Sequence, residues 1–272
     1  ALFLPRKTSM RQVLSRYVPR MAVCFVIWTI IYNLYEGTLN VQALVSGYFH
    51  LWYLPFLCGV YLMLPFLQKI AEDDRLTDQL LVISFIISIV IPWLVNLGIF
   101  LMPDGAPVLR QMESMLNYTF FFDHVCTLLL GHRLHKTELN PKQRRCLYIL
   151  GLLCVALAGF GTIWASNRVH TQNTVFFDFG TPHIVCTAAA LFVFAKYNLK
   201  KLPKIVQWLA GLSFGIYLIH AMVIEILVDW NLHVLSFNPI WFVPVLTALI
   251  IAISAVITAV LSKIPVIGKY MV

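Results

Sequence analysis

The most constraining feature of this sequence is a series of continuous apolar runs, each about as long as a membrane-spanning helix. Crossing a hydrocarbon core about 30 Å thick takes roughly 20 residues of helix. Eight such runs lie at about 18–35, 49–67, 79–102, 116–132, 146–165, 182–196, 207–228 and 239–262. They lack the alternating ten-residue segments of membrane barrels. We therefore predict an all-α fold, a polytopic membrane helix bundle of about eight spans, with the short 182–196 run as its weakest member.

The composition excludes other classes of protein. Hydrophobic residues make up 60% of the 272 residues and charged residues only 12%, about half the usual share. Neither a soluble domain nor a disordered chain has this balance. The six cysteines (24, 58, 126, 146, 154 and 186) show no CxxC or other metal-like spacing, so we expect small buried side chains and no metal site.

The net charge of +8 indicates an orientation in the membrane, because short cytoplasmic loops carry an excess of Lys and Arg. The chain start, every second segment between the predicted spans and the chain end lie on the same side of the membrane. These segments hold 18 of the 20 basic residues: Arg6, Lys7, Arg11, Arg16, Arg20, Lys69, Arg75, Arg133, Lys136, Lys142, Arg144, Arg145, Lys196, Lys200, Lys201, Lys204, Lys263 and Lys269. The segments on the opposite side hold only Arg110 and Arg168. We predict that both chain ends are cytoplasmic and that the partner of these charges is the lipid bilayer, not nucleic acid.

Two segments place polar side chains inside predicted spans, where ionisable groups are costly unless they are paired or functional. The first, 48–55, carries His50, Trp52 and Tyr53 at the outward end of its span. Trp and Tyr also populate membrane interfaces by default, whereas His50 adds a general acid or base. In the second, 213–220, Ser213, Tyr217 and His220 follow a spacing of i, i+4 and i+7, which predicts one polar stripe on a helix. Such a histidine could also hydrogen-bond a neighbouring helix.

Other charged residues have two interpretations each. Asp123 and His124, inside the 116–132 run, could form a proton relay or pair with another span. Glu225 is predicted to point away from the stripe of His220 and to lie nearer the outer surface, where it could be solvated. Arg16 and Arg20 either anchor the first run beside anionic lipid or bind phosphate groups of a cytoplasmic substrate.

The segments 50–65 (HLWYLPFLCGVYLMLP) and 213–220 (SFGIYLIH) resemble two ordered motifs of the acyltransferase-three family, which comprises bacterial multi-span membrane O-acyltransferases. Between them, 120–136 is similar to a span end of the family, except that Asp123 and His124 stand where apolar or aromatic residues are expected. The opening residues 2–7 and the basic residues after them are similar to the end of the second span of the family and its basic loop. The resemblance covers essentially the whole chain and implies one acyltransferase-like transmembrane domain over 1–272.

Members of this family usually have ten spans, so the resemblance predicts that the first two are absent from this sequence. The best-supported catalytic histidine of the family lies on the first span, with an arginine upstream of it. A chain without that span is expected to hold only supporting residues and to be inactive alone.

The resemblance also implies a reaction. It predicts transfer of an acyl group, by default acetyl, from cytoplasmic acyl-CoA to a hydroxyl of a cell-surface or lipid-linked glycan, in a bacterial plasma membrane. No bound cofactor is expected. We assign His50 and His220 as candidate catalytic residues. The candidate substrate-binding residues are Trp52, Tyr53, Ser213, Tyr217, Arg16 and Arg20.

Two other functions stay open at this point. A secondary transporter or flippase would also use intramembrane Asp, His and Glu, although no paired halves or symmetrically broken spans are apparent. A non-catalytic membrane domain is the third possibility. Consumption of acetyl-CoA would favour the enzyme, and substrate counterflow without CoA would favour the transporter.

Overall fold

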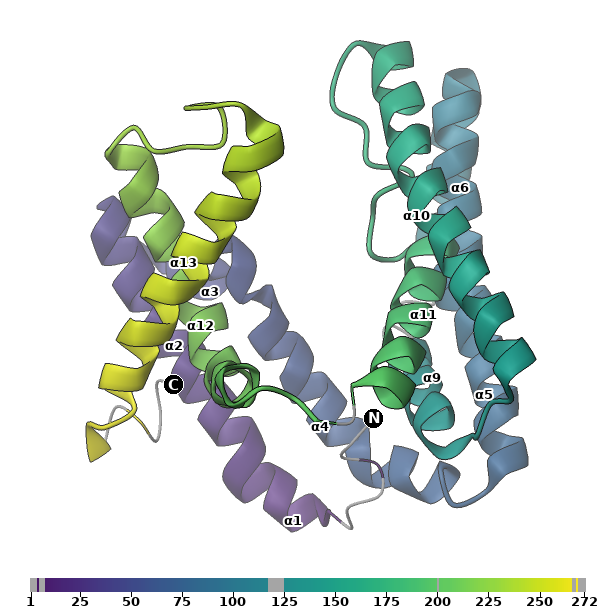
Figure 1. Cartoon of the computed structure of the whole chain (residues 1–272), viewed down its shortest axis with the longest axis horizontal. Coiled ribbons are helices and arrows are strands. Elements are labelled where there is room, and N and C mark those ends of the chain that lie inside the picture. The colour runs from purple at the N-terminus through teal and green to yellow at the C-terminus, as the bar shows by residue number, and fades with distance from the viewer. Residues whose placement is uncertain (1–3, 5–7, 117–124, 200, 266–267, 269–272) are drawn as a thin grey trace. The chain divides into compact units, whose positions relative to one another are not determined.

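The computed structural model describes residues 4, 8–116, 125–199, 201–265 and 268, and this part of the chain contains helices and no strand (Figure 1). The helices are α1 (Met10–Gln12), α2 (Val18–Glu36), α3 (Val41–Ser46), α4 (Tyr53–Ile70), α5 (Asp74–Phe85), α6 (Ile91–Leu101), α7 (Ala106–Leu116), α9 (Val125–Lys136), α10 (Pro141–Val169), α11 (Pro182–Asn198), α12 (Lys204–Asp229) and α13 (Pro239–Leu261). The predicted all-α class is confirmed.

Six helical stretches in the described residues are long and apolar enough to cross a membrane: Met10–Glu36, Phe49–Ile70, Asp74–Leu101, Pro141–Val169, Lys204–Asp229 and Pro239–Leu261. Each contains one of the predicted runs, or nearly all of it. The short 182–196 run forms α11, a helix of 17 residues. The remaining run, 116–132, lies partly outside the described residues, which resume at α9.

Two of the long stretches contain a single π-helical turn immediately before a proline. The turn Val13–Tyr17 precedes Pro19, and the turn Ile86–Val90 precedes Pro92. Proline lacks the N–H that an α-helix needs, and its ring clashes with the carbonyl four residues earlier. A π turn widens the backbone locally. Each apolar run therefore continues as one helical rod through its proline.

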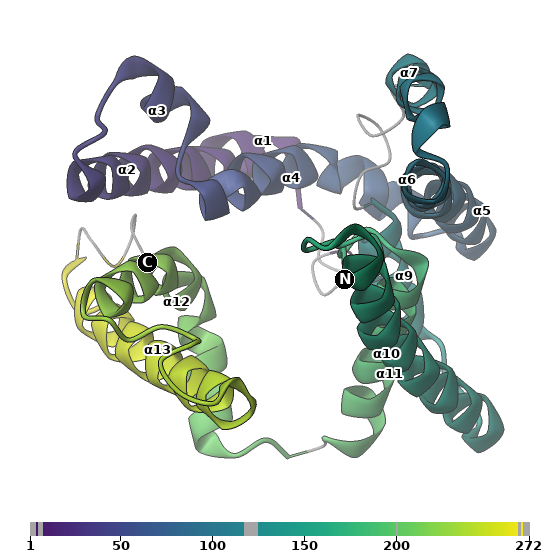
Figure 2. The same cartoon turned by 90° about the horizontal axis from the view of Figure 1, so that it is seen from above.

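The chain divides into two compact units, which are described separately. The first comprises residues 1–7 and 66–201, and in it α10 lies beside α11 (Figures 1 and 2). The second comprises residues 8–65 and 202–272, and in it α12 lies beside α13. The single domain inferred from the sequence stays a prediction.

The connection between α2 and α4 in the second unit depends on two glycines. Gly37 ends α2 with a φ of +68°, a left-handed conformation that glycine adopts without strain. Gly47 has a φ of +70°, and a Cβ atom there would lie 2.6 Å from the ring of Phe25 on α2. Only glycine fits at this approach. The next residues, Tyr48 to His50, are thereby brought back against the core that α2 shares with α12.

A lysine joins two helices in the first unit. Lys196, near the end of α11, donates hydrogen bonds to the carbonyl oxygens of Leu134, His135 and Thr137 at 3.2, 2.9 and 2.8 Å. These carbonyls end α9, where a cation satisfies unpaired acceptors and the helix dipole. Glu138 lies 3.2 Å from the same Nζ atom and also accepts the Tyr197 hydroxyl at 2.8 Å, and this hydrogen bond, with that of Lys196, lowers the pKa of Glu138.

Replacing this lysine should destabilise the first unit. We expect Lys196→Met to lower the free energy of unfolding by about 1–3 kcal/mol, because three carbonyls lose a charged donor at a site only partly open to water. The measurement is thermal unfolding of the purified chain in detergent. Lys201→Met, at an exposed position of the same unit, is the matched control. Equal midpoints for the two variants would contradict the role given to Lys196.

Candidate active site

Two histidines from distant parts of the chain meet in the second unit. His50 lies in the 3₁₀ turn Phe49–Trp52 that leads into α4, and His220 lies on α12. Their ring centroids are 5.2 Å apart, and the rings meet edge to face at 80°. The two residues that the sequence predicted to be catalytic therefore form one site, although 170 positions separate them in the chain.

Tyr217 connects the two histidines through both of its oxygen atoms. Its hydroxyl donates a hydrogen bond to the backbone carbonyl of His50. Its own carbonyl lies 2.6 Å from Nδ1 of His220. Tyr217 thus holds the start of α4 against the turn of α12 that carries His220, and the predicted spacing of Tyr217 and His220 places both on the side of α12 that faces His50.

The hydrogen bond between His220 and the Tyr217 carbonyl determines which ring nitrogen of His220 carries the hydrogen. A carbonyl oxygen only accepts, so Nδ1 of His220 must carry the hydrogen of the pair. In the neutral ring the lone pair then belongs to Nε2, the atom that a general base would use. Both ring nitrogens of His50 are buried and have no hydrogen-bond partner among the described residues. The Leu218 carbonyl lies near that ring, and it accepts the Tyr32 hydroxyl at 2.8 Å.

Aromatic side chains enclose His50, which is only 7% exposed. The rings of Tyr32, Tyr48 and Phe49 contact it with centroid distances of 5.0, 5.6 and 5.5 Å. Tyr32 and Tyr48 stack on each other at 4.4 Å. Tyr32 was not among the candidate site residues predicted from the sequence. Its only distinguishing feature there is that it is a phenol within an apolar run, four residues after Trp28.

Glu225 has a protein partner that the sequence did not indicate. It is half-buried, and its Oε1 accepts the Tyr48 hydroxyl at 3.1 Å. The Gly47 turn brings Tyr48 to this carboxylate. Burial, followed by the carboxylates of Glu36 and Glu225, raises the pKa of Tyr48. The Tyr48 hydroxyl therefore keeps its proton and stays a donor. One turn further along α12, Asp229 accepts the Tyr35 hydroxyl at 2.6 Å.

The predicted substrate-binding residues of α4 and α12 divide into two groups. Tyr53 packs against Tyr217 with a centroid distance of 5.6 Å and so borders the histidine pair. Trp52 is 47% exposed and contacts Tyr53 and Phe56. Ser213 is exposed, one turn of α12 before Tyr217. The prediction that Ser213 shares a stripe with Tyr217 and His220 describes the spacing correctly, but Ser213 belongs to a more open part of the helix.

The two arginines of the predicted phosphate site are exposed at the start of the second unit. Arg16 lies in the π turn Val13–Tyr17, and Arg20 lies in the first turn of α2. The Cζ atom of Arg20 is 5.8 Å from the centroid of the Phe214 ring. Phe214 precedes His220 by six residues, or about 9 Å along the axis of α12. The Arg20 guanidinium and the histidine pair therefore lie beside different turns of α12.

Two candidate residues cannot be placed, since Asp123 and His124 lie outside the described residues. Within the described ranges, no group of three or more His, Cys, Asp or Glu side chains is arranged to hold a metal ion. Among the described residues, the site contains two imidazoles, several phenols and one half-buried carboxylate.

Comparison with known proteins assigns the family. A family model described as an acyltransferase domain, that of the acyltransferase-three family, matches residues 2–259. The chain belongs to the acyltransferase-three family. With six candidate membrane-spanning helices in the part of the chain that the structure describes, it is a multi-pass membrane protein with an acyltransferase domain. No curated protein and no solved structure matches it.

The Tyr48–Glu225 contact should contribute measurably to the stability of this acyltransferase. We expect Tyr48→Phe and Glu225→Met, which has no such acceptor, each to lower the free energy of unfolding by about 1.5–3 kcal/mol, the range for a hydrogen bond to a charged group. The double variant should lose little more than either single one, because one interaction has been removed twice. Thermal unfolding in detergent measures all four proteins. Strictly additive losses would show that the two side chains act independently.

Proposed function

We propose that this protein is a membrane O-acyltransferase that moves an acyl group, by default acetyl, from cytoplasmic acyl-CoA to a hydroxyl of a cell-surface or lipid-linked glycan. The contact between buried His50 and partly buried His220 carries the proposal. Family membership supports acyl transfer, and the pair supplies a base of the kind that removal of a hydroxyl proton requires. The acyl-CoA donor, the hydroxyl acceptor and the catalytic roles are all part of the proposal.

The proposed reaction needs a general base for the acceptor hydroxyl and a proton for the departing CoA thiolate. Nε2 of His220 takes the proton of the acceptor hydroxyl while that oxygen attacks the acyl carbon. The new C–O bond forms, the C–S bond of the thioester breaks, and CoA leaves as the thiolate, which takes up the proton from the imidazolium. His50 lines the same space. The aromatic rings around it exclude water that would otherwise hydrolyse the thioester.

The charge distribution of the second unit supports a donor that approaches from one end. Arg16 and Arg20 are exposed near the beginning of the unit. Guanidinium groups pair well with the phosphates of a polyanionic CoA. On the side of the histidine pair towards the end of α12 lie Glu225 and Asp229. An acyl-CoA whose phosphates bind near Arg20 would therefore present its acyl group to the histidines from the side of the arginines. A neutral sugar hydroxyl would approach the histidines from the side of Glu225 and Asp229.

Removing the two imidazoles should abolish acyl transfer. We expect His50→Ala and His220→Ala together to reduce acyl-CoA-dependent acylation by at least about a hundredfold, the lower range for loss of general base catalysis. The assay measures CoA release and acylated glycan in membranes that contain the full-length gene product. His233→Gln, at an exposed position before α13, is the control. Normal turnover by the double variant would refute these roles, and acyl-CoA-independent counterflow of a substrate would indicate a transporter.

The proposed location is a bacterial plasma membrane with both ends of the chain on the cytoplasmic side, as the distribution of Lys and Arg indicates. Two single-cysteine variants test this orientation in a cysteine-free background: Lys142→Cys before the membrane portion of α10, and Thr171→Cys after α10. Both positions are exposed. We expect a membrane-impermeant maleimide to label residue 171 on intact spheroplasts and residue 142 only on inverted vesicles. The reverse pattern would invert the proposed topology.

A further inference from the structure

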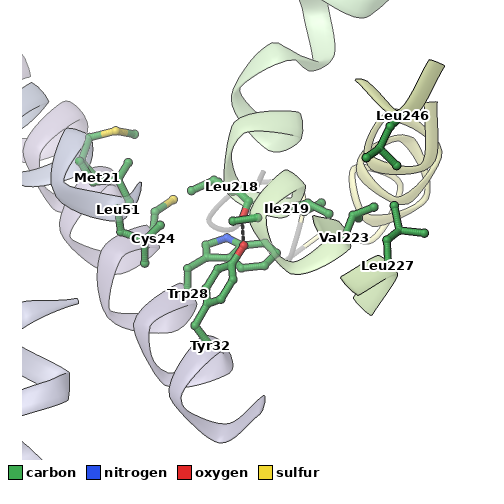
Figure 3. Close-up of a cluster of buried hydrophobic side chains, with 12 residues drawn as sticks. Met21, Cys24, Trp28, Tyr32, Leu51, Leu218, Ile219, Val223, Leu227 and Leu246 are labelled. Atoms are coloured by element: carbon green, nitrogen blue, oxygen red, sulfur yellow. Dashed lines mark hydrogen bonds between the residues drawn. The ribbon is translucent and has the colours of Figure 1, made fainter. Parts of the chain in front are cut away.

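The hydroxyl of Tyr32 lies between two backbone groups of α12 that are direct partners in a regular helix. It donates to the carbonyl of Leu218 at 2.8 Å (Figure 3). It also lies 3.1 Å from the amide nitrogen of Met222, which donates to it. These groups are four residues apart, the spacing of an α-helical hydrogen bond. A side chain that enters this ladder is a recognised cause of local helix distortion. The turn so bridged, 218–222, is the one that contains His220.

The ring of the same tyrosine contacts the other histidine. Tyr32 is fully buried on α2, and its ring meets the ring of His50 edge to face at 5.0 Å. On its other sides it stacks on Tyr48 at 4.4 Å and contacts Trp28 at 6.0 Å. These neighbours leave the Tyr32 ring little freedom to move. One rigid side chain therefore touches His50 through its ring and holds the turn of His220 through its hydroxyl.

We propose that Tyr32 is a positioning residue for the histidine pair. Its hydroxyl sets the height and rotation of the 218–222 turn of α12, and its ring sets the plane of His50. The inference rests on the proposed function, in which the histidines serve the transfer of a proton. It adds a residue on α2 to a site that otherwise consists of the start of α4 and one face of α12.

This positioning matters because proton transfer depends steeply on geometry. The base and the hydroxyl must come within hydrogen-bond reach, about 2.6–3.2 Å. A displacement of about 1 Å can cost a factor of about a hundred in rate. Without the phenolic hydroxyl, the Leu218 carbonyl and the Met222 N–H lose their contact with α2, so the turn between them is no longer held against Tyr32. His220, which lies on that turn, would shift with it.

The test is Tyr32→Phe, which keeps the ring and removes only the hydroxyl. We expect kcat for acyl transfer to fall by about ten- to a hundredfold, with KM for acyl-CoA within about twofold of the unaltered protein. The matched control is Tyr148→Phe in the first unit, since the Tyr148 hydroxyl is buried and has no partner among the described residues. An unchanged kcat for Tyr32→Phe would overturn the proposal.

A double-variant cycle separates positioning from general stability. In a His220→Gln background, Tyr32→Phe should change the residual rate by no more than about twofold, because the group that Tyr32 positions is already absent. A full, additive loss in that background would show a merely structural role and would overturn the proposal. The quantity measured is the residual acyl-CoA-dependent rate in membranes that contain equal amounts of each variant.

A readout independent of activity distinguishes failure of this inference from failure of the proposed function. Modification of individual histidines by diethyl pyrocarbonate is followed by mass spectrometry across a range of pH. We expect Tyr32→Phe to change the rate of modification of His220, whose turn loses the hydroxyl, and to leave His233 unchanged; His50 should change less, because the ring that contacts it is retained. An unaltered rate at His220 would refute positioning by Tyr32. Absence of acylation by the unaltered protein, with changed histidine reactivity, would refute only the proposed function.

Discussion

Polar groups within an apolar medium must find their partners inside the protein, and this constraint organises the second unit. A hydrogen-bonding group that is left unpaired in hydrocarbon costs several kcal/mol. The phenols there accordingly use backbone atoms or carboxylates as partners: Tyr32 pairs with α12, Tyr217 with the His50 carbonyl, and Tyr48 with Glu225. Each pairing joins two elements, so the satisfaction of polar atoms also fixes how α2, the start of α4 and α12 pack.

The ring nitrogens of His50 depart from this pattern, as do the hydroxyls of Thr29, Ser254 and Thr258 in the same unit. All are buried and have no hydrogen-bond partner among the described residues. Unsatisfied buried polar atoms are uncommon in proteins, and functional sites are among the places where they occur. The ring of His50 lies beside that of His220, whose Nδ1 is engaged by the Tyr217 carbonyl.

Glycine and proline determine how the helices deliver these residues. The π turns allow apolar rods to continue through Pro19 and Pro92, so α2 extends unbroken to Tyr32. The close approach of Gly47 to Phe25 then returns the chain to α2 and places Tyr48 and His50 beside Tyr32. Local backbone chemistry in a segment of about 40 residues thus supplies half of the site, and α12 supplies the other half.

The sequence by itself determined the helical class and the positions of the long apolar stretches, which depend on composition and on runs of about 20 residues, both local properties. Its motifs carried the resemblance to the family and made His50 and His220 candidate residues. Only the tertiary structure decided that His50 meets His220, that Tyr32 bridges the 218–222 turn, that Glu225 pairs with Tyr48 and that Ser213 lies apart from them. The contacts concerned join residues 167 to 190 positions apart. No periodicity within a single helix carries that information, because the packing of one helix face against another selects the partners.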